Sequence, residues 1–310
     1  NGLDLVAWSE LAPKAPFYLF IPQNESLREE YDKGWSVKDI FKVSGVGICS
    51  KRDNIVFQDS KEKLKELLND FATKSKEEIY RKYDIGDDSG GWKLEWAINE
   101  VKKHKDNLDD FITQCHYRPF DLRWTFYTNQ NCGFMARPVY DIFKHFLPSD
   151  SSLRDKTKSP LPCARVVQGV GKNTPKSKHT PPLAPPARGG EQDSNPQNEN
   201  VGLNIARQSR LYGSWQYIFA TNGLVDFSLM GGGNTGAGHI FPLYLKDNDS
   251  QIENFTPQFR AFVDKQYGES YAPKVILGYI YAVLYHKDYR EKYVDFLKID
   301  FPKVPFVKSK

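Results

Sequence analysis

Three short segments of this sequence combine side chains whose hydrogen-bonding groups suit nucleic acid. They are Ser50-Lys51-Arg52-Asp53, Tyr117-Arg118 with Arg123, and Arg207-Gln208-Ser209-Arg210. Arginine can donate two parallel hydrogen bonds to guanine, glutamine can read adenine in the same two-pronged way, and serine or further basic side chains can hold phosphates. We therefore predict that the DNA-facing residues are Ser50, Lys51, Arg52, Tyr117, Arg118, Arg123, Arg207, Gln208 and Arg210.

The same arginines also have a structural explanation. Arg118 and Arg123 lie among five aromatic rings in QCHYRPFDLRWTFY, residues 114–127, which we expect to be strand-like. Ion pairs with carboxylates such as Asp121 would lock such a strand into a polar network. Contact with bases or phosphates and internal pairing both remain open for each arginine.

A metal-dependent nuclease is an alternative that the acidic residues raise. Asp88, Glu100 and Lys102 together resemble the carboxylates and lysine that gather about a divalent metal. Glu100 and Lys102, however, belong to an amphipathic run whose inward face comprises the apolar residues from Leu94 to Val101, so we expect both on a solvated helix face. Helix capping explains Asp88 equally well. No catalytic residue is therefore predicted.

The glycine-rich stretch GGGNTG, residues 231–236, formally matches a dinucleotide-binding fingerprint. Such a site requires a strand before the glycines and a helix after them. Here the strand-like HIFPLYL follows, so we expect a loop.

Net charge gives no independent support for DNA binding. Residues 151–200 contain eight Lys or Arg and four Asp or Glu, which accounts for the whole net charge of +4. This segment also holds eight of the 19 prolines, and no aromatic residue occurs in it. With so little apolar surface to bury, it cannot offset the entropy of ordering. We expect residues 150–200 to be a disordered Pro/Gly-rich insertion.

Cysteine usage and hydropathy indicate the compartment. The cysteines at 49, 115, 132 and 163 form no Cys-x-x-Cys pair, and the six histidines are scattered, so no metal site is predicted and reduced thiols are expected. No apolar run approaches the ~20 residues that span a membrane. The N-terminal NGLDLVAWSEL has neither an initiator Met nor a signal-peptide pattern. We expect a cytoplasmic fragment of a longer protein, without membrane contact.

Hydrophobic periodicity predicts an irregular order of strands and helices. Strand patterns occur at 17–22, at the apolar end of 45–58, at 215–222 and at 239–245. Five helix patterns occur. Two follow the capping boxes Asp59/Glu62 and Ser75/Glu78, and a third covers 94–101. The fourth begins at Thr256-Pro257 and stops at Gly268, and the fifth runs from Pro273 to Leu297. Because βαβ alternation is absent, we predict an α+β fold with mixed or antiparallel sheet elements and flanking helices.

Five segments, in chain order, carry a family resemblance. They are WSELAPKAPFYLFIPQNESLREEYDKGWSVKDIFKVSGVGICSKRD, YRPFDLRWTFYT, NVGLNIARQS, IFPLYL and GYIYAVLYHKDYREKYVDFLKIDFPKVP. In this order they resemble the C-terminal target-recognition (specificity) region of type ISP restriction-modification enzymes and related adenine-specific DNA methyltransferases. The resemblance covers nearly everything except residues about 150–200.

The resemblance implies a DNA-reading module that is not catalytic by itself. In the family a nuclease, a helicase-like motor and an N6-adenine methyltransferase precede this region. Residues 1–149 and 201–310 would then form the N-terminal and C-terminal parts of one target-recognition domain, and double-stranded DNA and the parent's methyltransferase domain would be its partners. The motifs SKRD, YRPFD-x-R and ARQSR would face DNA.

The family's Asn-Pro-Pro-Tyr-type motif and its S-adenosylmethionine loop do not occur in these 310 residues. No cofactor is therefore expected in this fragment, and S-adenosylmethionine is expected in the parent's methyltransferase domain. Two alternatives stay open. One is the nuclease fragment described above. The other is a scaffold that docks the methyltransferase domain through the aromatic-rich helices from Pro273 to Ile299.

Overall fold

The computed structural model describes residues 25–147, 200–208, 215–230, 238–247 and 250–307. Within these ranges helices and strands follow one another irregularly, and the strands form four small sheets. This confirms the predicted α+β class. The predicted strand at 17–22, the predicted loop at 231–236 and the predicted insertion, except for Asn200, lie outside the described residues.

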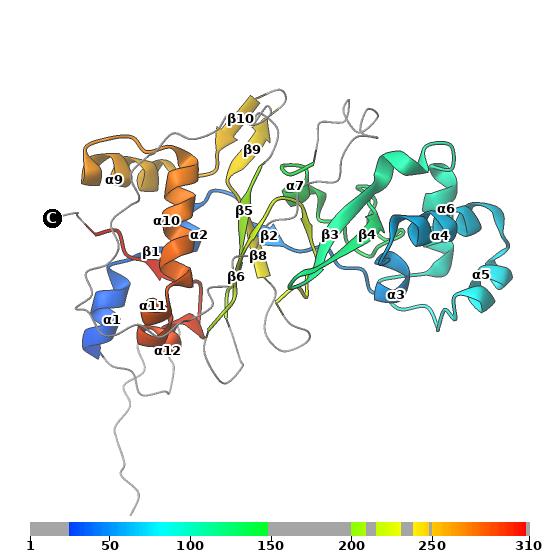
Figure 1. The fold of residues 1–310 in the computed structure, drawn as a ribbon, viewed down its shortest axis with the longest axis horizontal. Coiled ribbons are helices and arrows are strands. Elements are labelled where there is room, and N and C mark those ends of the chain that lie inside the picture. The colour runs from blue at the N-terminus through cyan, green and yellow to red at the C-terminus, as the bar shows by residue number, and fades with distance from the viewer. Residues whose placement is uncertain (1–24, 148–199, 209–214, 231–237, 248–249, 308–310) are drawn as a thin grey trace, which may run out of the picture.

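A four-stranded antiparallel sheet occupies the middle of the molecule (Figure 1). Its side chains alternate between two hydrophobic cores, as the pleat of a strand requires. Ile240 belongs to the first core and its neighbour Phe241 to the second. The sheet order is β2 (Gly45–Val46), β8 (Gly238–Pro242), β5 (Gly202–Ala206) and β6 (Ile218–Thr221).

The first core lies beneath a helical layer and a β-hairpin on one side of this sheet (Figure 1). The hairpin strands are β3 (Ile112–Arg118) and β4 (Asp121–Phe126), and β7 (Leu224–Val225) adds to β3 in parallel. The helices are α3 (Asp53–Val56), α4 (Lys61–Thr73), α5 (Lys76–Lys82), α6 (Leu94–Lys103), the 3₁₀ turn η1 (Leu108–Phe111) and α7 (Tyr140–Phe143).

Local capping explains where α4 and α5 begin. Ser75 and Glu78 form the predicted capping box of α5, in which each side chain accepts a hydrogen bond from the other residue's backbone. At α4 the predicted box was wrong by one residue, because Ser60 is the cap and accepts from Lys63 N at 3.2 Å. Asp59 instead pairs with Lys63 Nζ at 2.7 Å.

The second core joins N-terminal and C-terminal residues on the other side of the sheet (Figure 1). Thr256 caps α9 with Pro257 at its first turn, and Gly268 ends it with φ 74°, all as predicted. The elements are α1 (Glu25–Asp32), β1 (Trp35–Ser36), α2 (Val37–Ile40), β9 (Tyr244–Asp247), β10 (Ser250–Glu253), α9 (Pro257–Tyr267), α10 (Pro273–Tyr285), α11 (Lys287–Lys292), α12 (Val294–Leu297) and β11 (Lys303–Val304).

Three sequence predictions were wrong because tertiary packing overrode local pattern. The helix expected from Pro273 to Leu297 is divided into α10, α11 and α12, and the last two bring Tyr293 and Phe296 within 5.0 Å and 4.9 Å of the Tyr31 ring. The apolar end of 45–58 is helix α3 and not a strand. The strand expected at 239–245 is split into β8 and β9. None of the helices in the described ranges is long and apolar enough to cross a membrane.

The two ends of the segment 148–199 are held together by direct contacts. The buried Asn200 side chain donates to His145 O at 3.0 Å, and the backbone N–H of Lys246 donates to His145 Nδ1 at 3.0 Å. The described residues on either side of 148–199 therefore lie close together, and the entropic cost of joining two such points by a flexible chain grows only slowly with its length.

We therefore predict that replacing residues 150–199 with four Gly/Ser residues preserves the fold. If the replaced segment is flexible, the shorter connection should raise the free energy of unfolding by about 2 kcal/mol, since each halving of its length contributes about 0.6 kcal/mol. Urea unfolding followed by circular dichroism measures this. Asn200→Ala in the full chain is the control and should destabilise, because it removes buried hydrogen bonds. Loss of cooperative unfolding in the shortened chain would contradict the prediction.

Candidate nucleic-acid interface

The arginine-bearing segment 114–127 forms two strands of a hairpin, so the expectation of one strand was wrong. Arg118 pairs with Asp121 across the hairpin, which leaves Pro119 and Phe120 as a two-residue turn. Proline presets the first turn position, and Phe120 has a positive φ of 65° at the second. The turn therefore lies between the two arginines and sends Arg118 and Arg123 to different strands.

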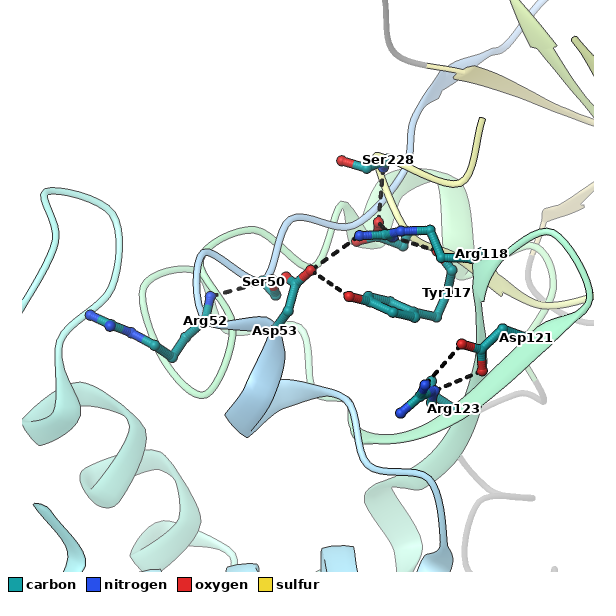
Figure 2. Close-up of polar contacts among 9 residues, drawn as sticks. Ser50, Arg52, Asp53, Tyr117, Arg118, Asp121, Arg123 and Ser228 are labelled. Atoms are coloured by element: carbon teal, nitrogen blue, oxygen red, sulfur yellow. Dashed lines mark hydrogen bonds and ion pairs between the residues drawn. The ribbon is translucent and has the colours of Figure 1, made fainter. Parts of the chain in front are cut away.

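Arg118 is the centre of a polar network that joins three segments (Figure 2). Its Nη1 donates to Asp226 Oδ1 at 2.6 Å and to Tyr117 O at 2.6 Å, and its Nη2 lies 3.2 Å from Asp53 Oδ2. Tyr117 Oη donates to the same Asp53 oxygen at 2.9 Å. The structural explanation from the sequence is thus confirmed for Arg118, with Asp53 and Asp226 as its partners.

Asp226 is the buried member of this network. Burial raises the pKa of Asp226 to about 6, whereas the Ser228 N–H and the Arg118 guanidinium favour its charged form. The loop that carries it packs against the backbone of Gly47: a Cβ there would lie 2.6 Å from Phe227 N. Ile48 N donates to Val225 O and Phe227 N donates to Ile48 O, each at 2.8 Å, which fixes this close approach.

Arg123 is held separately, on the next strand. Its Nε and Nη2 donate to the two oxygens of Asp121 at 2.7 Å and 2.9 Å, a bidentate pair (Figure 2). Tyr117 contacts both arginines, because the guanidinium carbons of Arg118 and Arg123 lie 3.8 Å and 5.4 Å from its ring centroid. The aromatic platform expected around the two arginines is therefore present, with one ring shared between them.

The Ser50–Asp53 segment forms a tight loop beside this network. Ser50 is buried, and its hydroxyl donates to Asp53 Oδ1 and accepts from Arg52 N at 3.3 Å. Lys51 adopts a positive φ of 59° and is exposed. Arg52 turns away and stacks on Trp92, with its guanidinium carbon 5.0 Å from the ring, while Nη2 donates to Asp87 O. Asp53 thus brings the first two predicted clusters together.

The third predicted cluster is not joined to these two by any contact in the described residues. Arg207 Nε pairs with Asp300 Oδ1 at 2.8 Å, and the Arg207 side chain is 55% exposed. Gln208 is exposed, and Ser209 and Arg210 lie outside the described residues.

Two participants escaped the sequence analysis. Asp226 lies beyond the predicted insertion at 150–200, far from Arg118 in the sequence. The residues around Asp226 therefore give no sign that its carboxylate pairs with Arg118. Arg137 exchanges two backbone hydrogen bonds with Cys49, at 2.9 Å and 3.0 Å, which places it next to the Ser50–Asp53 loop. Its side chain is exposed near the Phe227 ring. Lys51 and Arg137 form no ion pair with any carboxylate of the described ranges, unlike Arg118, Arg123 and Arg207.

The residues of the nuclease alternative have structural contacts instead. Glu100 was expected on a solvated helix face, which is wrong: it is 2% exposed and accepts hydrogen bonds from Thr128 Oγ1 and Phe134 N. Burial raises its pKa, since a desolvated carboxylate is costly. Asp88 Oδ1 accepts from Leu94 N at 3.0 Å at the start of α6, as capping predicted, and Lys102 is exposed. No three metal-ligating side chains cluster within the described part of the chain.

The sequence matches a known family on both sides of the predicted insertion. Residues 39–153 and 188–310 match the family described as Type ISP C-terminal specificity domain. The chain therefore belongs to this family, and the resemblance noted in the sequence is confirmed. The match is interrupted at 154–187, within the segment that we predicted to be inserted.

Solved structures share the fold. A cryo-EM structure of a DrdV–DNA complex matches 98% of this chain and 26% of its own at 18% identity and a TM-score of 0.58. A nuclease-deletion mutant of the Type ISP restriction-modification enzyme LlaGI, solved with a DNA substrate mimic, is a second match. It covers 99% of this chain and 24% of the LlaGI chain, at 15% identity and a TM-score of 0.52. The ATP-dependent Type ISP restriction-modification enzyme LlaBIII bound to DNA is a third match. It covers 90% of this chain and 16% of the LlaBIII chain, at 15% identity and a TM-score of 0.51.

The chain therefore spans only 16% to 26% of the length of these proteins. At such identities the likeness establishes the fold. No curated protein matches the sequence.

The geometry predicts that the two hairpin arginines differ in their contribution to stability. Arg118→Met leaves the Asp226 carboxylate, 5% exposed, without its cation and should lower the free energy of unfolding by about 3 kcal/mol. Arg123→Met breaks a pair whose side chains are 33% and 35% exposed and should lower it by less than about 1 kcal/mol. Urea titrations of the two variants measure the difference.

A second substitution tests the cause. Asp226→Asn in the Arg118→Met background removes the buried charge and should recover part of the loss. Equal losses for the two single variants, or no recovery in the double variant, would show that the Arg118–Asp226 pair does not hold the three segments together.

Proposed function

We propose that this chain is the DNA target-recognition domain of a restriction-modification adenine-N6 DNA methyltransferase and that it has no chemistry of its own. The observation that carries the proposal is its membership of the Type ISP specificity family over 39–153 and 188–310. DrdV, LlaGI and LlaBIII, which share the fold, were solved with DNA or a DNA substrate mimic. In this proposal residues 1–149 and 201–310 form one recognition unit.

The surface formed by the Ser50–Asp53 loop, Arg137 and the β3–β4 turn is the proposed DNA-binding surface. A cation already paired with a carboxylate has little net charge to offer a phosphate, whereas an unpaired exposed cation keeps all of it. Lys51 and Arg137 are exposed and have no carboxylate partner among the described residues, and we assign them to phosphates. Arg52 also lacks a carboxylate partner there, but its guanidinium stacks on Trp92 and donates to Asp87 O. The strained backbone at Lys51 supports this role, because such conformations concentrate at ligand-binding positions.

The arginines predicted to read bases differ in how many of their guanidinium nitrogens are already used in hydrogen bonds within the protein. Arg118 uses both terminal nitrogens internally, so we propose that it positions Tyr117 and the Ser50–Asp53 loop. Arg123 uses its Nε edge on Asp121 and keeps Nη1 for a ligand. Ser50 and Arg52 shape the loop, whereas Arg207, Gln208 and Arg210 remain candidate DNA contacts.

The parent enzyme supplies the chemistry in this proposal. Methylation of adenine N6 requires the base to be flipped out of the duplex, and the recognition domain supports this by gripping the flanking DNA. The parent's methyltransferase domain, which would bind S-adenosylmethionine, is the second proposed partner, and the cytoplasm is the proposed location. The contacts of Asp88 and Glu100 disfavour the nuclease alternative. The scaffold alternative has no specific support, since α10 buries Ile276, Leu277, Ile280 and Leu284 in the second core.

The assignment of Lys51 and Arg137 predicts a salt effect. Lys51→Ala and Arg137→Ala should each weaken binding to all duplexes about equally and reduce the slope of log K against log salt by about 1, because one phosphate contact is lost. Fluorescence anisotropy with a mixed-sequence duplex of about 30 base pairs measures the affinity. Repeating the titration between about 50 and 200 mM salt gives the slope.

Lys292→Ala is the matched control. Lys292 is paired with Glu30 at 2.6 Å on α11, at the opposite end of the molecule from α3 (Figure 1), and its loss should leave the slope unchanged. Binding by the wild-type chain that does not depend on salt, or equal effects of all three variants, would contradict the proposed surface. Arg123→Ala and Arg207→Ala then separate base from phosphate contact, because loss of a base reader relaxes preference at one position and costs about 1–3 kcal/mol.

A further inference from the structure

Phe120 is an aromatic side chain left in solvent at the tip of the β3–β4 hairpin. It is 67% exposed, the highest value among the large apolar side chains of the described residues. It contributes to neither hydrophobic core, although other rings of the same hairpin, such as Tyr117 and Trp124, pack against the first core. Its exposure is therefore a property of this position and not of the hairpin as a whole.

The backbone at Phe120 is strained as well. Its φ of 65° lies in the left-handed region, which bulky residues rarely adopt. A two-residue turn with proline first and a positive φ second ordinarily has glycine at the second position. Glycine would remove both the strain and the exposed apolar surface, so folding gives no reason for phenylalanine here. A residue held against local preference at a surface indicates a ligand contact.

The hairpin holds this ring in a defined place. Arg118, just before the turn, is bound to Asp226 and Asp53, and Asp121, just after it, is bound by Arg123 through two hydrogen bonds. The Arg118 end of the turn is thereby fixed to two other segments of the chain, and the Asp121 side chain is held within its own strand β4. A ligand that meets Phe120 does not have to order the loop first, which lowers the entropic cost of binding.

The surroundings of Phe120 identify the kind of partner. Contiguous exposed apolar patches mark protein-docking surfaces. The residues that flank this turn are instead the charged Arg118, Asp121 and Arg123. Through Asp53 the same hairpin is connected to the loop that carries Lys51. A single apolar ring on a charged surface, in a hairpin bonded to the loop that carries the exposed Lys51, resembles the side chains that insert between base pairs of a duplex held by its phosphates.

Resting on the proposed function, we propose that Phe120 is a wedge that stacks on a base step of the bound duplex and partly unstacks it. The wedge contacts bases by stacking, which every base can accept, so it contributes affinity and local distortion more than sequence discrimination. Local unstacking would lower the work of flipping a neighbouring adenine.

The test uses the full 310-residue chain and a duplex that the wild-type chain selects from a random-sequence library, labelled with 2-aminopurine at successive positions. 2-Aminopurine brightens when it is unstacked. The wild-type chain should raise the fluorescence severalfold at one step. Phe120→Gly should abolish this rise and weaken binding about tenfold, which corresponds to about 1.4 kcal/mol. Phe120→Trp should restore both.

Stability measurements distinguish the wedge from a structural role. Because glycine accepts a positive φ, Phe120→Gly should keep or raise the melting temperature while it weakens binding. Tyr80→Ala removes another exposed aromatic ring, 44% exposed on α5, and is the control that should change neither affinity nor fluorescence.

Four outcomes would overturn the inference. If Phe120→Gly binds DNA as tightly as the wild type, or if no labelled step brightens while the wild type binds with strong salt dependence, the wedge is wrong and the proposed function stands. If Phe120→Gly keeps its DNA affinity but loses binding to the methyltransferase part of the parent supplied separately, the ring belongs to a protein contact. If the wild type selects no duplex, the proposed function and the wedge fail together.

Discussion

The ion pair between Arg118 and Asp226 is the interaction on which the proposed surface depends. It connects β3 to the segment after β7. Arg118 also pairs with a second carboxylate, that of Asp53, and so connects β3 to the start of α3. The Asp226 side chain is only 5% exposed, so its desolvation is costly and is offset by the guanidinium and by the Ser228 N–H. Because the pair is partly buried, removal of either partner disturbs three segments at once.

This pair also separates two tasks that arginine could perform in the same place. Arg118 is held by internal contacts, and in the proposed function the positive charge that meets DNA comes from its exposed neighbours Lys51 and Arg137. The turn between Arg118 and Asp121 is rigid for the same reason, which allows it to hold Phe120 in an unfavourable backbone conformation. A surface ordered before binding loses less entropy when a partner arrives.

The two cores explain how the fold accommodates an interruption in its middle. The first core combines buried residues from 48–146 with Leu224, Val225, Leu229 and Ile240. The second combines buried residues from 31–41 with buried residues from Leu203 onward. Each core therefore requires chain from both sides of the gap in the family match. Asn200 and His145 bring the two sides together by a direct hydrogen bond, so that both cores can form whatever the length of the chain between them.

The sequence by itself determined the α+β class, the family, the capping box of α5, the ends of α9 and the aromatic setting of the arginines, because these depend on local pattern and on short-range hydrogen bonds. It did not determine the hairpin turn at Pro119–Phe120, the division of the C-terminal helices, the burial of Glu100, or the choice of Asp226 as the partner of Arg118. Arg118 and Asp226 are 108 positions apart, and a carboxylate selects its cation by proximity in space. Only the packing of β7 against β3 brings them within hydrogen-bond distance, and that packing decides that the Arg118 guanidinium is used inside the molecule.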